Sequence, residues 1–371
     1  MPSAAPETAC GVYVHVPFCD GKCHYCAFYS VPYTTETAAR WLRALAREMQ
    51  PWRGSRLRTV YIGGGTPSLL TPTQWDDLAD LLLTTFKIHA GAEWSVEINP
   101  GSVTAAGLCR MAAAGVNRIS LGAQSFHDHE LQLLGRRHSV SDIARAVEAI
   151  RAAGITNFNL DLLAGIPGAT PRDWRKSLYA ALDLQPSHLS VYALTIEEGT
   201  RLAHPSLKRK LRIPDVETYL AALDTAENIL RRAGYTRYEI SNYARPGRAC
   251  RHNLDCWRGK QYLGFGPAAA AYINRIRRQN LPDLNAYLTD LERGRQPPHE
   301  SEHITPALAR TDRLIFGLRM AEGVSVRLAD AGQRAVLQRL AQDGLVRQRH
   351  GRWHLTKRGR ELADYVAVEL L

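Results

Sequence analysis

The sequence predicts an α/β fold, a partial (β/α)6 barrel followed by a smaller winged-helix-like domain. Three observations support this prediction. Six short β-rich runs alternate with helical patterns in the first half of the chain, helix start and stop signals lie between them, and a polar, proline-rich stretch precedes a short C-terminal region. Strands joined by helices run parallel, so we expect the functional groups at their carboxyl ends.

The six predicted strands are separated by recognisable helix boundaries. Thr71, Pro72 and Gln74 form a capping box with proline at the first helical position. Gly115 and Gly154 stand where alanine-rich helices should end. The predicted strands are residues 11–16, 58–64, 94–99, 118–123, 157–163 and 189–194.

The second half of the chain predicts an extension and a separate domain. A helix at about 215–233 precedes a strand-like stretch, residues 236–244. Residues 295–306 are polar and proline-rich, which is typical of a linker. The remainder has the order helix, helix, strand, strand, helix of a winged-helix module. We therefore predict one domain of residues 1–294 and a second domain of residues 295–371. The winged-helix-like fold of the second domain does not by itself assign a function to that domain.

Composition predicts a cytoplasmic protein. Of the 371 residues, 45% are hydrophobic and 22% are charged, as in globular proteins. The N-terminus has no basic start followed by an apolar run, and no stretch of eighteen apolar residues occurs. Seven cysteines, an odd number, do not resemble a secreted disulfide framework.

The net charge of +11 is compatible with several anionic partners. Basic runs at 207–212 and 273–279 suit nucleic acid, an anionic membrane surface or an acidic small molecule. Neither run contains interleaved aromatic residues for base stacking, so a solvated basic face is the favoured interpretation and nucleic-acid binding is not expected.

A C-x3-C-x2-C loop after the first predicted strand indicates an inorganic centre. Cys19, Cys23 and Cys26 could bind zinc, with His15 or His24 as a fourth ligand. Iron–sulfur clusters usually take four thiolates, so three cysteines would leave one iron free for a substrate or cosubstrate. The glycines of GGGTP (63–67), after the second strand, permit close approach of a small polar ligand.

These features resemble the radical S-adenosylmethionine (SAM) superfamily, in which a [4Fe–4S] cluster leaves one iron to the amino and carboxylate groups of SAM. The resemblance extends to the branch that contains oxygen-independent coproporphyrinogen III oxidase and the haem chaperone HemW, and it covers nearly the whole chain. It is carried by YVHVPFCDGKC (13–23), GGGTP, VEINP (96–100), SLGAQSF (120–126), NLDLLAGIPG (159–168), YEISNYARPG (238–247) and HNLDCW (252–257).

The resemblance implies a set of cofactor-binding residues. Tyr13 matches an aromatic residue near the cluster-bound SAM, and Phe28, two positions after the third cysteine, is also predicted to be a cofactor-binding residue. The SAM amino group would be bound by the loop Gly64, Gly65 and Thr66. The methionine and ribose parts would be bound by polar residues that can form hydrogen bonds or ion pairs with them, namely Glu97, Gln124, Arg136 and Asp161.

Two motifs distinguish a haem chaperone from an oxidase. The oxidase motif continues to a fourth cysteine two positions after the third, where this chain has Phe28, as in the HemW form of the loop. HNLDCW resembles a haem-binding H-N-x-x-Y-W motif, which makes His252 the candidate iron ligand. Cys256 replaces the motif tyrosine, and Cys250 and Cys256 are interpreted as buried cysteines rather than as ligands.

The resemblance therefore implies a haem chaperone that binds a [4Fe–4S] cluster, SAM and haem in the context of porphyrin metabolism. It would transfer haem to recipient proteins, including ones at the inner face of the membrane, where basic residues suit anionic lipid. The electron donor is not specified by the sequence. The alternative is the oxidase itself, which converts coproporphyrinogen III to protoporphyrinogen IX by radical SAM chemistry.

Overall fold

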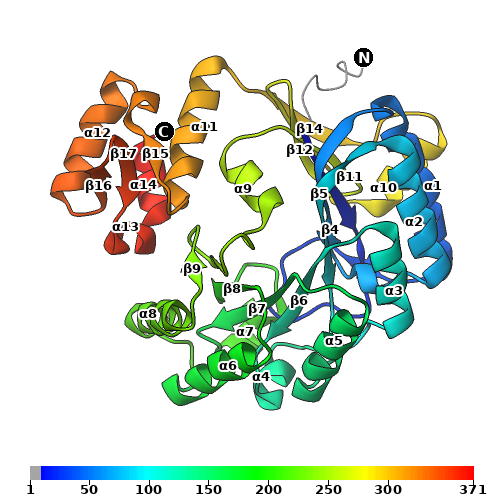
Figure 1. Ribbon diagram of the computed structural model, residues 1–371, viewed down its shortest axis with the longest axis horizontal. Helices are drawn as coiled ribbons and strands as arrows, with labels where there is room; N and C mark the ends of the chain where they lie inside the picture. Colours follow the sequence, from blue (N-terminus) through cyan, green and yellow to red (C-terminus); the bar gives the residue numbers. More distant parts are fainter. Residues whose placement is uncertain (1–9) are drawn as a thin grey trace.

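The computed structural model describes residues 10–371, and a sheet of twelve strands forms its centre (Figure 1). The strand order is β14-β13-β12-β11-β1-β4-β5-β6-β7-β8-β10-β9. Neighbouring strands from β11 through β8 are parallel, whereas the strands at both ends are antiparallel. No pairing between β14 and β9 closes the sheet within the described residues, so the predicted partial barrel is confirmed.

All six predicted parallel strands are present, and β11 adds a seventh beside β1. The parallel strands are β1 (Cys10–Val16), β4 (Arg56–Gly64), β5 (Lys87–Ile98), β6 (Arg118–Gln124), β7 (Phe158–Ala164), β8 (His188–Ala193) and β11 (Tyr262–Phe265).

Helices connect these strands and cover the outer face of the sheet (Figure 1). The predicted capping box at Thr71 and Gln74 is present, and Gly115 ends its helix with a positive φ of 109°. The helices are α1 (Thr35–Met49), α2 (Pro72–Thr85), α3 (Ala105–Ala114), α4 (Asp128–Leu133), α5 (Val140–Ala152), α6 (Pro171–Asp183), α7 (Pro205–Lys208) and α8 (Val216–Arg232), with 3-10 turns η1 (Gln50–Trp52), η2 (Pro67–Leu69) and η3 (Arg201–Ala203).

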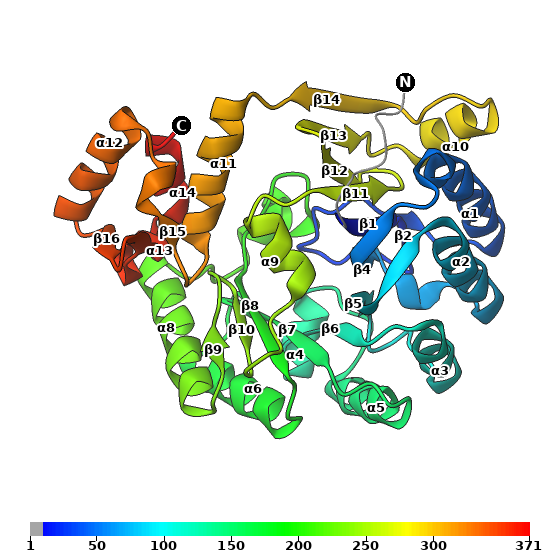
Figure 2. The same ribbon diagram turned by 45° about the horizontal axis from the view of Figure 1, so that its top comes forward.

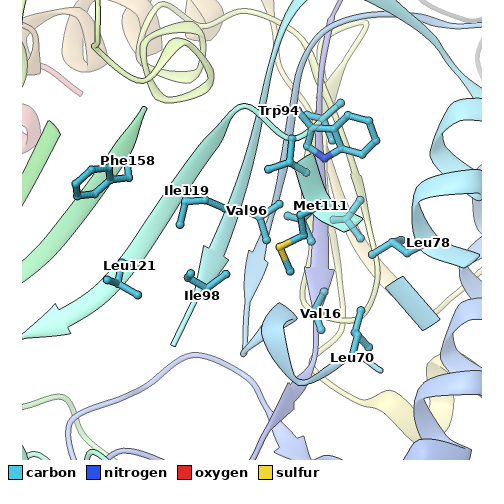
Figure 3. Packing of buried hydrophobic residues seen from close by; sticks show 14 of the residues in the cluster. Val16, Leu70, Leu78, Trp94, Val96, Ile98, Met111, Ile119, Leu121 and Phe158 are labelled. Carbon is cyan, nitrogen blue, oxygen red and sulfur yellow. The ribbon is translucent and has the colours of Figure 1, made fainter. Parts of the chain in front are cut away.

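The two faces of the parallel strands differ in polarity. Successive side chains of a strand point to opposite faces. On β5, Trp94, Val96 and Ile98 point outward and pack with helix residues such as Leu78 and Met111 in the main hydrophobic core (Figure 3). The inward-facing residues of the strands are polar, so the barrel lumen is suited to a polar ligand. They include Tyr13, Tyr61, Ser95, Glu97, Arg118, Ser120, Asn159, Asp161 and Ser190, whose strands are in register.

Two stretches of the second half differ from the sequence prediction. Residues 236–244 form two short strands rather than one, because Glu239 accepts a hydrogen bond from the backbone N–H of Ser241 and turns the chain. Residues 299–303, inside the predicted linker, form an edge strand that pairs with β13. The elements concerned are β9 (Thr236–Arg237), β10 (Asn242–Ala244), β12 (Ala270–Ile273), β13 (Ile276–Asn280), β14 (His299–His303), α9 (Arg251–Trp257) and α10 (Leu284–Glu292).

The C-terminal region has its own hydrophobic core and the predicted winged-helix-like order. This core includes Leu314, Leu337, Trp353 and Val366. Helix α9 lies between the barrel and α11 (Figures 1 and 2). The elements are α11 (Pro306–Arg319), β15 (Val324–Ser325), η4 (Val326–Leu328), α12 (Ala331–Gln342), β16 (Val346–Arg349), β17 (Arg352–Leu355), α13 (Lys357–Glu361) and α14 (Ala363–Glu369).

In residues 10–371, none of the helices combines the length and the apolar character needed to cross a bilayer.

Candidate functional site

The three cysteines lie in a loop at the carboxyl end of β1. Cys19 ends the short strand β2 (Phe18–Cys19), which pairs with β3 (Val31–Pro32). The backbone N–H of Cys26 donates to the carbonyl of Cys23 at 3.2 Å, which forms a turn. His24 Nδ1 donates to the Leu133 carbonyl at 2.8 Å and anchors this turn to α4. All three thiols are unpaired and half-buried.

The surroundings of the loop fit an iron–sulfur cluster. Cys23 and Cys26 line a cavity of about 630 Å³ whose other wall includes Arg201 and Lys210. Burial raises the pKa of the Cys26 thiol, and Lys22 opposes this shift. A cube distributes its thiolate ligands over separate irons, so this donor set suits a cluster with one iron lacking a protein ligand.

The glycine loop packs directly against the cysteine loop. The backbone N–H groups of Gly65 and Thr66 donate to the carbonyls of Val16 and Phe18, and Thr66 Oγ1 lies 3.5 Å from Cys19 Sγ. A Cβ on Gly65 would lie 2.4 Å from the Phe18 carbonyl oxygen, and Gly64 has a φ of 100°. Glycine is therefore required here by close backbone contact and by left-handed conformation.

Two carboxylates face the lumen at the same end of the barrel. Glu97 accepts hydrogen bonds from Tyr61 Oη at 2.7 Å and from the Gly64 N–H at 3.0 Å. Asp161 accepts from Asn159 Nδ2 at 2.8 Å and from Ser120 Oγ at 3.2 Å. Burial raises the pKa of both carboxyl groups, and these hydrogen bonds oppose that shift. Both are therefore fixed acceptors for ammonium or hydroxyl groups.

Arg136 connects the cysteine loop to the lumen. Its Nη1 donates to Cys23 Sγ at 3.5 Å, and its Nη2 donates to the Gly122 carbonyl at 2.8 Å. Its buried Nε has no hydrogen-bond partner among the described residues. Tyr25, between the last two cysteines, lies against this guanidinium. Gln124, at the end of β6, has a positive φ of 67°. The unsatisfied donor suits an anionic ligand such as a carboxylate.

Tyr13 belongs to a hydrogen-bonded chain on the inner face of β1. Its hydroxyl donates to His15 Nδ1 at 3.0 Å, because His15 Nε2 carries the proton that it donates to the Tyr29 carbonyl. The Tyr13 ring lies 6.2 Å from the ring of Tyr61. Tyr13 thus places an aromatic surface between the cysteine loop and the lumen.

The HNLDCW helix, α9, closes the opposite, amino-terminal end of the lumen. Glu93 accepts the backbone N–H groups of Arg251 at 2.9 Å and His252 at 3.0 Å. His252 Nδ1 lies 2.9 Å from Thr59 Oγ1, and its ring is 5.2 Å from Tyr61. His252 is buried, so its side chain is held by the barrel in this conformation.

The pKa of His252 is lowered to about 4, mainly because burial disfavours the imidazolium. Unfolded His252 takes up a proton near pH 6.5, whereas the folded residue resists protonation until about pH 4. Its contribution to stability is therefore complete above pH 6.5 and is lost as the pH falls toward 4. His138, with a pKa also near 4, acts in the same direction.

We expect the free energy of unfolding to fall as the pH is lowered from 7 to 4. In His252→Gln this fall should be smaller by about 3 kcal/mol, because the variant no longer loses the free energy that is coupled to protonation of His252 on unfolding. Urea unfolding across this pH range measures the difference. His89→Gln, which changes an exposed histidine, should leave the pH dependence as in the unmodified chain. If His252→Gln and the unmodified chain showed the same pH dependence, burial would not lower the pKa of His252 as described.

The same helix contacts the C-terminal domain through Trp257. Its ring lies 6.1 Å from Phe316, and the Arg319 guanidinium lies 4.8 Å from the ring centroid. Both partners belong to α11. The HNLDCW segment therefore lies at the interface of barrel and C-terminal domain.

Comparison with known proteins places this architecture in a family. Residues 13–179 match the model of the radical SAM superfamily. Heme chaperone HemW of Mycobacterium tuberculosis is 36% identical over 382 aligned positions, covering 100% of this chain and 97% of the relative. HemW of Bacillus subtilis is 33% identical over 371 positions, covering 95% and 97%. The chain belongs to the HemW family of the radical SAM superfamily.

The fold of this HemW-family chain is similar to a solved structure of the related oxidase. Coproporphyrinogen III oxidase (HemN) from Escherichia coli, described as a radical SAM enzyme, superposes with a TM-score of 0.86. It is 25% identical, and the match covers 98% of this chain and 90% of HemN. The radical SAM barrel and the C-terminal region are therefore shared by the two proteins.

In the HemW-family chain the sequence-predicted residues fall into three places. The cysteines and the residues predicted to bind SAM lie together at the carboxyl ends of the strands, and Tyr13 faces the lumen beside them. Phe28, which was predicted to be a cofactor-binding residue, is 71% exposed. His252 lies at the other end of the barrel. Their ligand roles stay predictions.

Two residues of the site, Tyr25 and Tyr61, were not predicted from the sequence of this HemW-family member. Tyr25 was missed although it lies between two cysteines, and Tyr61 was missed although it alternates with the outward-facing Val60 and Ile62. That alternation is the signal that could have identified Tyr61. Tyr61 connects the two ends of the lumen, since its hydroxyl contacts Glu97 and its ring contacts His252.

Proposed function

We propose that this chain is a haem chaperone that carries a [4Fe–4S] cluster, binds SAM, and transfers haem to recipient proteins. The observation that carries the proposal is the three-cysteine loop packed on the glycine loop, in a chain similar over its whole length to heme chaperones HemW. The proposed setting is the cytoplasm, with some recipients at the inner face of the membrane.

Each part of SAM has a proposed partner in the described residues. The cluster would be held by Cys19, Cys23 and Cys26. The amino group would lie at the glycine loop, where Glu97 accepts from Gly64. The buried Nε of Arg136 would donate to the methionine carboxylate, and Asp161 would accept from the ribose hydroxyls. The chemistry that a reduced cluster supplies when bound is one-electron transfer to SAM.

The proposed haem ligand His252 needs a change of conformation. It is buried, its Nδ1 contacts Thr59, and the helix that carries it is held by Glu93. Ligation of iron through His252 would therefore require α9 to move away from the barrel. Trp257, which packs on α11, offers a mechanical connection between such a movement and the C-terminal domain.

The oxidase is the second candidate, favoured by the structural similarity to HemN. Phe28 argues against it, since the oxidase loop has a fourth cysteine at that position. We expect the anaerobically reconstituted chain to bind haem and to release no protoporphyrinogen IX from coproporphyrinogen III in the presence of SAM and a reductant. Absorption spectroscopy and product analysis on one sample measure both. Turnover without haem binding would overturn the proposed function.

A further inference from the structure

A large cavity lies on the outer side of the strands that extend the barrel. It has a volume of about 560 Å³ and is lined by the end of α1, by η1, by α10 and the segment that follows it, and by strands β11–β14. Figure 2 shows α1 and α10 beside these strands. Ligand-binding cavities typically have this size and combine apolar walls with a few convergent polar groups. Most of its wall comes from residues after 179, beyond the part that matches the superfamily model.

The cavity and the HNLDCW helix lie on opposite faces of the same strands. Tyr262 lies 6.3 Å from the ring of His252, whereas Leu263, its neighbour on β11, lines the cavity. On the β12–β13 hairpin, the paired residues Ala271 and Arg278 also line the cavity. Since neighbouring side chains of a strand alternate between faces, the cavity is separate from His252.

The walls suit a flat, apolar molecule. The apolar residues come from one turn after α1, from α10 and from the strands, and aromatic side chains among them provide planar surfaces. They include Trp52, Leu263, Phe265, Ile273, Ile276 and Leu291.

Three arginines give the cavity an affinity for carboxylates. Arg47 Nη1 donates to the Leu291 carbonyl at 2.9 Å, Arg278 Nη2 donates to Asn280 Oδ1 at 3.1 Å, and Arg295 pairs with Asp290. These bonds use only part of the five donors that each guanidinium carries, which leaves donors for an anionic ligand.

The one acid in the wall does not oppose such a ligand. Glu48 accepts hydrogen bonds from the Gly266 N–H at 2.8 Å, Asn280 Nδ2 at 2.7 Å and Tyr287 Oη at 2.6 Å. Burial raises the pKa of this carboxyl group, and the three hydrogen bonds, which occupy its oxygens, oppose that shift. The charge that remains at the cavity is positive.

His299 adds an imidazole to the wall. Its Nδ1 lies 2.8 Å from the Pro297 carbonyl, which only accepts, so Nδ1 is the protonated nitrogen. The lone pair of the neutral ring is therefore on Nε2. A histidine that binds a metal through one nitrogen commonly has its other N–H fixed by such a carbonyl.

We infer that this cavity binds haem, with its propionates at the arginines and with His299 as an axial ligand. Haem combines a flat apolar ring, two carboxylates and an iron that binds imidazole, and the cavity offers a counterpart for each. The inference rests on the proposed function and extends it. This site accepts haem while α9 is closed, and His252 would act only after α9 has moved.

The test is a haem titration of the full-length chain, followed by the Soret absorbance. In His299→Ala, the affinity should fall by about tenfold or more, because loss of even an outer-shell partner of a metal ligand costs that much. His303→Ala is the matched control: it lies on the same strand, is exposed, and does not line the cavity. Its affinity should equal that of the unmodified chain.

Two further arms test the cavity itself. Ala271→Trp should fill it and weaken haem binding while thermal unfolding and cluster content stay unchanged. Haem dimethyl ester, which lacks the carboxylates, should bind about tenfold more weakly, because charge-assisted hydrogen bonds are lost.

The outcomes separate this inference from the proposed function. If His299→Ala and Ala271→Trp both bound haem as the unmodified chain does, and His252→Ala did not, the inference that the cavity binds haem would be overturned. The proposed chaperone function would still stand. Absence of haem binding in the unmodified chain would overturn both.

Discussion

Replacement of Cys26 by serine is expected to abolish assembly of the [4Fe–4S] cluster. The loop supplies three thiolates, and a cube that already lacks a protein ligand at one iron would retain only two protein ligands. Iron and sulfide analysis after anaerobic reconstitution should fall from about four of each per chain to near zero. The visible absorption of the cluster should be lost in parallel.

The control for this experiment is Cys109→Ser. Cys109 is an exposed cysteine on α3, outside the candidate site, so its replacement should leave the iron content unchanged. A full complement of iron and sulfide in Cys26→Ser would contradict the proposed cluster, because it would mean that other residues hold the metal.

Replacement of Glu93 by alanine is expected to destabilise the whole domain by about 1 to 3 kcal/mol for each buried donor that is left without its acceptor. Glu93 accepts the backbone N–H groups of Arg251 and His252 and the thiol of Cys250. It also lies in the electrostatic field of Arg118, a buried cation whose Nε has no hydrogen-bond partner among the described residues.

Urea unfolding of Glu93→Ala, Glu93→Gln and Glu300→Ala measures this effect. The glutamine retains an acceptor for the α9 backbone, so it should lose only part of the stability. Glu300 is exposed on β14, and its replacement should change the free energy of unfolding by less than about 0.5 kcal/mol. Equal stability of Glu93→Ala and the unmodified chain would show that α9 is not held by this contact.

Local sequence patterns predicted the barrel and its cysteine loop well. The strands alternate outward apolar and inward polar residues, as Val60, Tyr61 and Ile62 do on β4, and the helices between them carry caps such as Thr71. The cysteines and the glycine loop each follow a strand, so parallel topology brings them together. Motif order therefore predicted that the cysteine loop and the glycine loop lie together, but it did not identify Tyr61, which also faces the lumen.

Contacts between distant segments were not predictable in this way. No local pattern indicates that His252 lies on Thr59, 193 positions away, or that Trp257 packs on Arg319. The edge strand β14 was missed because its sequence, HESEH, lacks β-branched residues, and its pairing with β13 overrides that weak propensity. Tertiary pairing determined these features.

The most direct measurement of the central claim is the electron paramagnetic resonance spectrum of the anaerobically reconstituted, reduced chain, recorded with and without SAM. The account predicts a [4Fe–4S] signal that changes when SAM is added, because SAM would bind the iron that Cys19, Cys23 and Cys26 are proposed to leave without a protein ligand. A chain that carries zinc, or an iron–sulfur signal that is identical with and without SAM, would contradict it.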